Sequence, residues 1–123
     1  KRMLSSMTPT IVEKNGDLFM TLGTPGGSTI ITSVVQTILN VHEFNMTMQE
    51  AVNSARFHHQ WKPDSIRIES DYFSKDVKNQ LLKSGYKLND KGSIGRVDGI
   101  LVKKDKTLEG GADKRGDDTA IGF

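Results

Sequence analysis

TIVEKNGDLFMTLGTPGGST, residues 10–29, is the stretch that decides the fold. Its first part holds two β-prone runs on either side of Asn15-Gly16, the strongest short hairpin signal, because both residues accept a positive φ. The pattern predicts a strand at 10–13 and a returning strand at 18–22. The glycine-rich run that follows has the composition of a loop.

Downstream of this loop the spacing of apolar residues becomes helical. Apolar side chains recur at i, i+4 and i+8 across 29–41, which predicts a buried helix with Ser28 as its N-cap. Thr47 and Glu50 have the spacing of a capping box. They predict a second, shorter helix over about 48–53.

The second half of the chain mixes further strands with one helix. Residues 74–84 have an amphipathic pattern that Gly85 ends, which predicts a third helix. The remaining expected strands lie at 65–69, 96–103, 107–111 and 120–123. Strands grouped at both ends around a block of helices favour an α+β layered fold over a doubly wound parallel sheet.

Composition limits the classes of function. The chain has 123 residues, which suits a single domain or a piece of one. The net charge is +2 with basic and acidic residues intermixed, which argues against a nucleic-acid partner. Because there is no cysteine, a disulfide framework and a thiolate metal site are excluded. The apolar runs are too short to span a bilayer, and no sequence pattern indicates a cofactor.

The glycine-rich loop is the most informative local feature. Gly26 and Gly27 stand between a predicted strand and a helix start, where backbone N–H groups have no partner within the helix. Successive glycines can aim these groups at one point and so bind an anion or oxyanion. The spacing fits neither a Walker loop nor a dinucleotide fingerprint. On local sequence alone, a tight strand-to-helix turn that needs glycine only for steric reasons is the favoured interpretation.

Three other groups of polar residues are candidates for chemistry or ion pairing. Ser5 and Ser6 could hydrogen-bond a carboxylate, although most serine pairs are turn or cap residues. His58 and His59 are adjacent without a third ligand at metal-binding spacing, so a packed aromatic segment is favoured over a metal site. Charged residues toward the end of the sheet are expected to form surface ion pairs of small energetic value: Arg56, Asp113, Arg115, Asp117 and Asp118.

Taken together, these segments resemble the γ-glutamyltransferase family. Residues 2–12 look like its Arg-Pro-Leu-Ser-Ser-Met-Ser-Pro-Thr-Ile segment, and residues 23–28 look like its Gly-Ser-Pro-Gly-Gly-Ser loop. Residues 56–61 look like its Arg-Phe-His-His-Gln-Trp stretch, and residues 111–118 resemble its closing Ala-x-Asp-x-Arg segment. The resemblance covers essentially the whole chain in the same order.

The resemblance implies an N-terminal-nucleophile hydrolase with a four-layer αββα sandwich. Such an enzyme is a zymogen that cuts itself into a large and a small subunit, and a Thr at the new chain start attacks the substrate. It would cleave γ-glutamyl amides such as glutathione and pass the glutamyl group to water or to an amino acid or peptide. Ser5 and Ser6 would hold the α-carboxylate of the substrate, and Gly26 and Gly27 would supply oxyanion-hole donors.

Residues 1–123 are accordingly expected to be one single-domain piece, the C-terminal fragment of the small, catalytic subunit. No residue matches the nucleophilic Thr, so the fragment is expected to be inactive alone. Its expected partners are the large subunit and the upstream part of the small subunit, and its sheet edges should be unpaired unless it oligomerises or distorts. Met3 and Thr29 depart from the Pro and Arg that are common at these positions.

Other functions remain open at this point. A cephalosporin or glutaryl acylase, or a poly-γ-glutamate-processing enzyme, would share the fold, and a non-catalytic module could use the Gly26 loop merely to hold an anion. The family implies a periplasmic or extracellular location for the parent enzyme.

Overall fold

The computed structural model describes residues 7–69, 73–90 and 92–122 and divides into two compact units. The first unit comprises Lys1–Ser54 and Gly95–Phe123, and the second comprises Ala55–Ile94. Both contain strands and helices, so the predicted α+β class is confirmed. No helix in the described part of the chain is long and apolar enough to cross a membrane.

The predicted hairpin opens the first unit. Strand β1 (Thr10–Lys14) pairs antiparallel with β2 (Asp17–Gly23). The turn residues Asn15 and Gly16 both have positive φ, 56° and 87°, as the dipeptide predicted.

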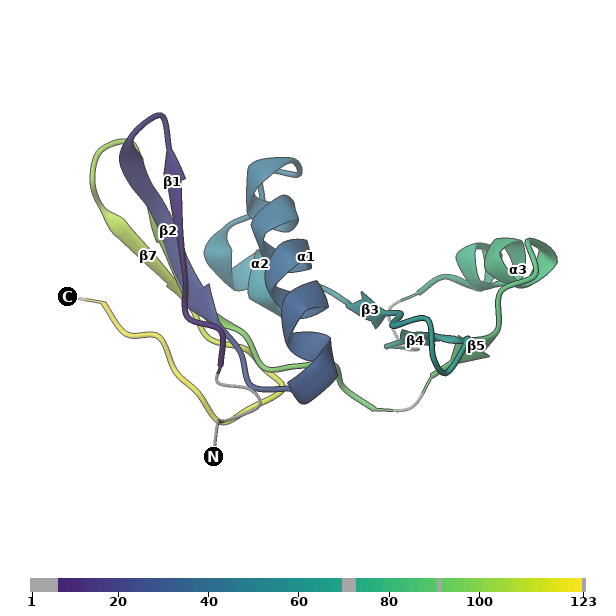
Figure 1. Cartoon of the computed structure of the whole chain (residues 1–123). Coiled ribbons are helices and arrows are strands. Elements are labelled where there is room, and N and C mark those ends of the chain that lie inside the picture. Colours follow the sequence, from purple (N-terminus) through teal and green to yellow (C-terminus); the bar gives the residue numbers. More distant parts are fainter. Residues whose placement is uncertain (1–6, 70–72, 91, 123) are drawn as a thin grey trace. The chain divides into compact units, whose positions relative to one another are not determined.

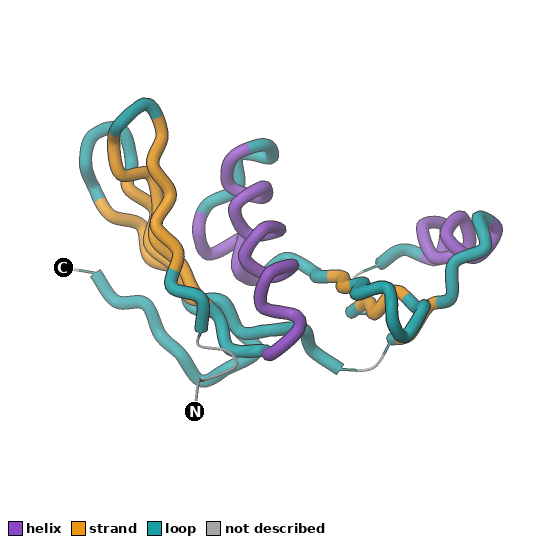
Figure 2. The backbone as a smooth tube through the Cα atoms, in the orientation of Figure 1, coloured by secondary structure: helices purple, strands orange, loops and turns teal. Residues whose placement is uncertain are grey.

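This hairpin forms half of a four-stranded antiparallel sheet. Strand β6 (Asp98–Val102) lies beside β2, and β7 (Leu108–Gly111) completes the order β1-β2-β6-β7. Helices α1 (Ile30–His42) and α2 (Met48–Asn53) lie together on one side of the sheet (Figures 1 and 2). In the described part of the first unit, no helix lies on the other face.

The core lies between this sheet and its two helices. Alternate residues of β2, Met20 and Leu22, point into it, as the period of two requires. Two buried hydroxyl groups on α1 are satisfied locally, because Ser33 and Thr37 donate to the carbonyl oxygens four residues earlier. The buried apolar cluster is Met20, Leu22, Ile30, Val34, Val41, Met48, Ala51, Val52 and Val97.

The helix starts were predicted with mixed success. The Thr47 capping box is confirmed, since the Glu50 carboxylate accepts from the Thr47 N–H at 2.8 Å and the Thr47 hydroxyl accepts from the Glu50 N–H at 3.2 Å. Ser28 as N-cap of α1 was wrong. The chain enters α1 through a 3₁₀ turn (Gly27–Thr29), so Ser28 lies inside this turn and Thr29 precedes the helix.

Helix α2 packs directly against the backbone of strands β6 and β7. A Cβ atom at Gly111 would lie 2.7 Å from Cγ and 2.8 Å from the carbonyl oxygen of Met48, so only glycine permits this approach. Glu109 fixes the same helix start, because its Oε1 accepts from the Met48 N–H at 2.6 Å. Its Oε2 lies 2.8 Å from the Lys103 ammonium.

This arrangement predicts an acid-sensitive anchor. The Lys103 hydrogen bond, followed by that from the Met48 N–H, holds the pKa of Glu109 below its ordinary value of 4.5. A lowered folded-state pKa adds stability above the unfolded pKa, and this stability is lost as pH falls through the folded pKa. We expect Glu109→Gln to lower the melting temperature at pH 7, and the difference from wild type to vanish as pH falls below 4.5. A difference that does not change between pH 7 and pH 3 would contradict this role.

The second unit is a small sheet with one helix. Strands β3 (Phe57–His58) and β4 (Ile66–Ile68) pair antiparallel, and β5 (Leu88–Asn89) pairs parallel to β4. Helix α3 (Lys75–Lys83) is capped by Ser74, whose hydroxyl accepts from the Val77 N–H. The predicted third helix and the strand at 65–69 are confirmed, whereas the two-residue strands β3 and β5 were not predicted.

A buried polar cluster ties the two ends of this unit together. The Glu69 carboxylate accepts from the Arg56 N–H at 2.8 Å and from the Ile94 N–H at 2.7 Å. The Arg56 guanidinium, in a residue only 1% exposed, donates to the Ile94 carbonyl oxygen at 2.9 Å. Arg56 is therefore a buried structural residue, and the expectation of a surface ion pair was wrong for it.

The predicted final strand is not formed in its described part. Ala120–Gly122 have no strand pairing. A Cβ atom at Gly110 would lie 3.0 Å from the Cβ of Ala120, so the terminal segment passes over the open face of β7. A segment above the sheet cannot join its hydrogen-bond ladder.

Candidate functional site

The glycine-rich loop has the geometry of an anion-binding turn. Gly26 has φ 148° and ψ 7°, and Gly27 has φ 59°. A ψ near zero places the nitrogen atoms of Gly26 and Gly27 on the same side of the Gly26 Cα, so that their N–H groups face one region. Both residues are exposed, and neither N–H has an acceptor among the described residues.

The two predicted serines, Ser5 and Ser6, lie outside the described residues. The next residue in the chain, Met7, is described and contacts the glycine loop. Its carbonyl oxygen accepts from the Thr24 N–H at 2.8 Å. Met7 therefore lies beside the loop that carries Gly26.

Two threonine hydroxyls support this loop from below. Thr24 is fully buried, and its hydroxyl donates to the Pro25 carbonyl oxygen at 2.7 Å and accepts from the Arg96 N–H at 2.8 Å. Thr29, also buried, donates to the Gly26 carbonyl oxygen at 3.0 Å. Sequence reasoning assigned no role to either residue. The available signal was that a hydroxyl residue flanks the Pro-Gly-Gly-Ser run on each side.

The segment that resembles the closing part of the family, residues 111–118, contains a buried charge pair. Asp113 is 0% exposed, and its Oδ1 lies 2.9 Å from Nη1 of Arg115, whose side chain is 6% exposed. The other carboxylate oxygen accepts from the Val97 N–H at 2.8 Å. The Arg115 guanidinium also donates to the carbonyl oxygens of Val52 and Ser54, at the C-terminal end of α2. The expectation of a weak surface pair was therefore wrong for Asp113 and Arg115.

The neighbouring charges form one exposed pair, through Asp117, and one partly buried pair, through Asp118. Asp118 lies 2.8 Å and Asp117 3.5 Å from the Arg96 guanidinium, whose side chain is 43% exposed. Because the Arg96 N–H donates to the Thr24 hydroxyl, these pairs lie close to the threonine that contacts the glycine loop.

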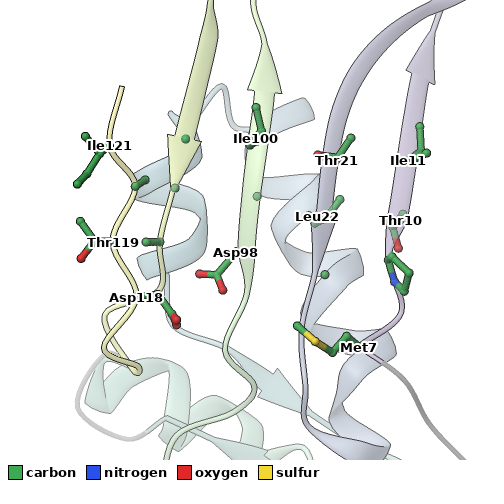
Figure 3. Close-up of a pocket in the computed structure, with 17 residues that line it drawn as sticks. Met7, Thr10, Ile11, Thr21, Leu22, Asp98, Ile100, Asp118, Thr119 and Ile121 are labelled. Atoms are coloured by element: carbon green, nitrogen blue, oxygen red, sulfur yellow. The ribbon is translucent and has the colours of Figure 1, made fainter. Parts of the chain in front are cut away.

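A broad groove of about 1010 Å³ lies along the face of the sheet opposite the helices. Figure 3 shows Ile11, Thr21 and Ile100 on neighbouring strands of this face, with Ile121 of the terminal segment at its edge. Ile11 is 71% exposed and Ile121 is 86% exposed. Among the described residues of the first unit this face is mainly apolar, and the terminal segment passes over its β7 side.

The histidine segment has local partners. His58 lies 2.9 Å from the Gln60 side-chain oxygen, and His59 lies 3.6 Å from Asp64. Within residues 7–69, 73–90 and 92–122, no group of three or more potential ligands is arranged to hold a metal ion.

Solved structures with a similar fold indicate the class of protein. The chain aligns along its whole length with γ-glutamyltranspeptidase from Pseudomonas nitroreducens, with a TM-score of 0.89, 40% identity and coverage of 64% of that chain. A cephalosporin acylase from Bacillus halodurans shares the fold with a TM-score of 0.74 at 24% identity, over 85% of this chain and 20% of the acylase. The chain thus has the α+β fold of N-terminal-nucleophile hydrolases.

Sequence comparison then gives the family. The γ-glutamyltranspeptidase family model matches residues 1–123. The glutathione hydrolase proenzyme of Escherichia coli K12 is 44% identical over 124 aligned residues, which cover 100% of this chain. The chain belongs to the γ-glutamyltranspeptidase family, and the resemblance deduced from its motifs is confirmed.

The chain spans only about a fifth of the length of the curated relatives it matches, 21% of the E. coli proenzyme.

Proposed function

We propose that this chain is the C-terminal part of the small subunit of a γ-glutamyltransferase, which cleaves γ-glutamyl amides such as glutathione. In this proposal the enzyme is made as a self-cleaving precursor, and a Thr outside this chain is the nucleophile. The chain alone is inactive, because it supplies binding and oxyanion residues only. The glutamyl group passes to water or to an amino acid or peptide, and no cofactor takes part.

The observation that carries the proposal is the geometry of the Gly26–Gly27 loop. When the nucleophile attacks the γ-carbonyl carbon, the carbonyl oxygen becomes an oxyanion. Two neighbouring N–H groups that have no acceptor among the described residues, at an exposed turn before a helix, are suited to stabilise this charge. Family membership makes an acyl transfer reaction the chemistry that such a turn would serve.

The serine pair supplies the second part of the site. We propose that the hydroxyl groups of Ser5 and Ser6 donate to the α-carboxylate of the γ-glutamyl group. The contact between Met7 and Thr24 supports a shared site, because Met7 directly follows Ser6 in the chain. Hydrogen bonds to a charged group are worth about 1.5–3 kcal/mol each.

The remainder of the precursor completes the fold in this proposal. About a third of the solved P. nitroreducens chain lies outside the aligned part, because the alignment covers 64% of it. We propose that the upstream part of the small subunit covers the apolar open face that Ile11 and Ile100 line, and that the large subunit completes the active site. By family analogy, the parent enzyme is placed in the periplasm or outside the cell.

The serine role is tested with two matched substrates. In the full-length precursor, we expect Ser5→Ala and Ser6→Ala each to lower kcat/KM for γ-glutamyl-p-nitroanilide by about 10- to 100-fold. γ-Aminobutyryl-p-nitroanilide lacks the α-carboxylate, so its slower cleavage should be unchanged in both variants. An equal loss on both substrates would mean that the serines do not bind the carboxylate.

A further inference from the structure

The orientation of the two candidate oxyanion donors is set by consecutive peptide groups. In a trans peptide the C=O and the following N–H lie in one plane and point in opposite directions. The Pro25 carbonyl therefore fixes where the Gly26 N–H points. The Gly26 carbonyl fixes the Gly27 N–H in the same way. Glycine has no side chain to restrict these peptide planes, so other contacts must hold them.

Each of these two carbonyl oxygens accepts a hydrogen bond from a buried threonine. The Thr24 hydroxyl donates to the Pro25 oxygen at 2.7 Å. The Gly26 oxygen accepts from the Thr29 hydroxyl at 3.0 Å and also from the Thr29 N–H at 3.2 Å. Thr24 is 0% exposed and Thr29 is 5% exposed, so water does not readily replace either hydroxyl. The donors on the opposite sides of the same peptide groups are the two exposed N–H groups.

The support beneath Thr24 is itself fixed. Its hydroxyl accepts from the Arg96 N–H at 2.8 Å while it donates to Pro25, so the direction of its proton is defined. Gly95 packs against it closely, because a Cβ atom at Gly95 would lie 3.2 Å from the Thr24 hydroxyl and 2.7 Å from that of Ser33. The loop before β6 thus sets the position of Thr24.

We propose that Thr24 and Thr29 are positioning residues that aim the Gly26 and Gly27 N–H groups at the developing oxyanion. This inference rests on the proposed function and extends it to two side chains that do not touch the substrate. Each threonine binds the carbonyl side of one peptide group and leaves its N–H side free for the substrate.

The test replaces each hydroxyl with a methyl group of the same shape. We expect Thr24→Val and Thr29→Val, in the full-length precursor, each to lower kcat for γ-glutamyl-p-nitroanilide by about 10- to 100-fold. KM should change little, because the ground-state substrate carries no oxyanion. Thr24→Ser and Thr29→Ser retain the hydroxyl and should recover most of the wild-type kcat.

Thr37→Val is the matched control. Thr37 is also fully buried, and its hydroxyl donates to the Ser33 carbonyl oxygen within α1, away from the loop. We expect this variant to keep kcat within about twofold of wild type. Equal losses in all three valine variants, or no loss at Thr24 and Thr29, would overturn the proposal.

Hydrogen exchange separates this inference from the proposed function. Peptides covering residues 23–30 should exchange faster in Thr24→Val and Thr29→Val than in wild type or Thr37→Val, whatever the substrate. A wild-type enzyme that does not cleave γ-glutamyl-p-nitroanilide would refute the proposed function. Unchanged exchange in these peptides would refute the positioning role of the threonines.

Discussion

Replacing Gly26 with alanine is expected to lower kcat by about 100- to 1000-fold, the usual loss of one oxyanion-hole donor. Two effects add at this position. The backbone φ of 148° is one that residues with a side chain rarely adopt, and the new Cβ would lie 2.6 Å from the Thr29 hydroxyl. The loop must shift to relieve both, which moves the Gly26 and Gly27 N–H groups. The measurement is kcat for γ-glutamyl-p-nitroanilide on the self-cleaved fraction of the full-length enzyme.

Gly16→Ala is the control for backbone strain alone. Gly16 has a φ of 87° at the tip of the hairpin, and a Cβ there has open space around it. The substitution should cost about 1 kcal/mol of stability and leave kcat unchanged. If Gly26→Ala and Gly16→Ala reduce activity equally, the loss reflects folding, and Gly26 is not an oxyanion donor.

Removing the Asp113 carboxylate is expected to cause the largest loss of stability, about 3–5 kcal/mol for Asp113→Ala. The substitution leaves the Arg115 guanidinium buried without its carboxylate, and the Val97 N–H loses its acceptor. Since Arg115 also binds the carbonyl oxygens at the end of α2, the helix should loosen as well. Urea unfolding of the full-length protein measures the effect.

Asp117→Ala provides the comparison for an exposed carboxylate. The Asp117 side chain is 96% exposed and lies 3.5 Å from the Arg96 guanidinium. Its removal should change the free energy of unfolding by less than about 0.5 kcal/mol. Similar losses for Asp117→Ala and Asp113→Ala would show that burial does not govern the strength of these pairs.

Local signals in the sequence predicted most of the secondary structure. Asn15-Gly16 carries its own conformational preference, and the Thr47 capping box is satisfied within four residues, so neither depends on the rest of the fold. Gly26 and Gly27 became site candidates only through the family resemblance, because a glycine pair before a helix is locally consistent with a tight turn that needs glycine for steric reasons. Only the family resemblance linked this glycine pair to Ser5 and Ser6 in one site.

Features that depend on distant contacts were missed. The fit of Gly111 against Met48 joins residues far apart in the chain, and no local pattern marks it. The burial of Asp113 and Arg115 likewise depends on their packing against α2 and β6. In the sequence they form a charged pair in a polar segment, which is typical of a surface pair. Ser28 has the composition of an N-cap, but the glycine loop enters α1 through a 3₁₀ turn and places Ser28 too early.

The proposed γ-glutamyl specificity is tested most directly with two acyl donors that differ in one group. Glutaryl-p-nitroanilide has the same carboxylate as γ-glutamyl-p-nitroanilide but lacks the α-amino group, and it is the donor expected of a glutaryl acylase. The measurement is kcat/KM of the full-length, self-cleaved enzyme on both substrates. We expect a clear preference for the γ-glutamyl donor. Preference for the glutaryl donor, or cleavage of neither by a self-cleaved enzyme, would contradict it.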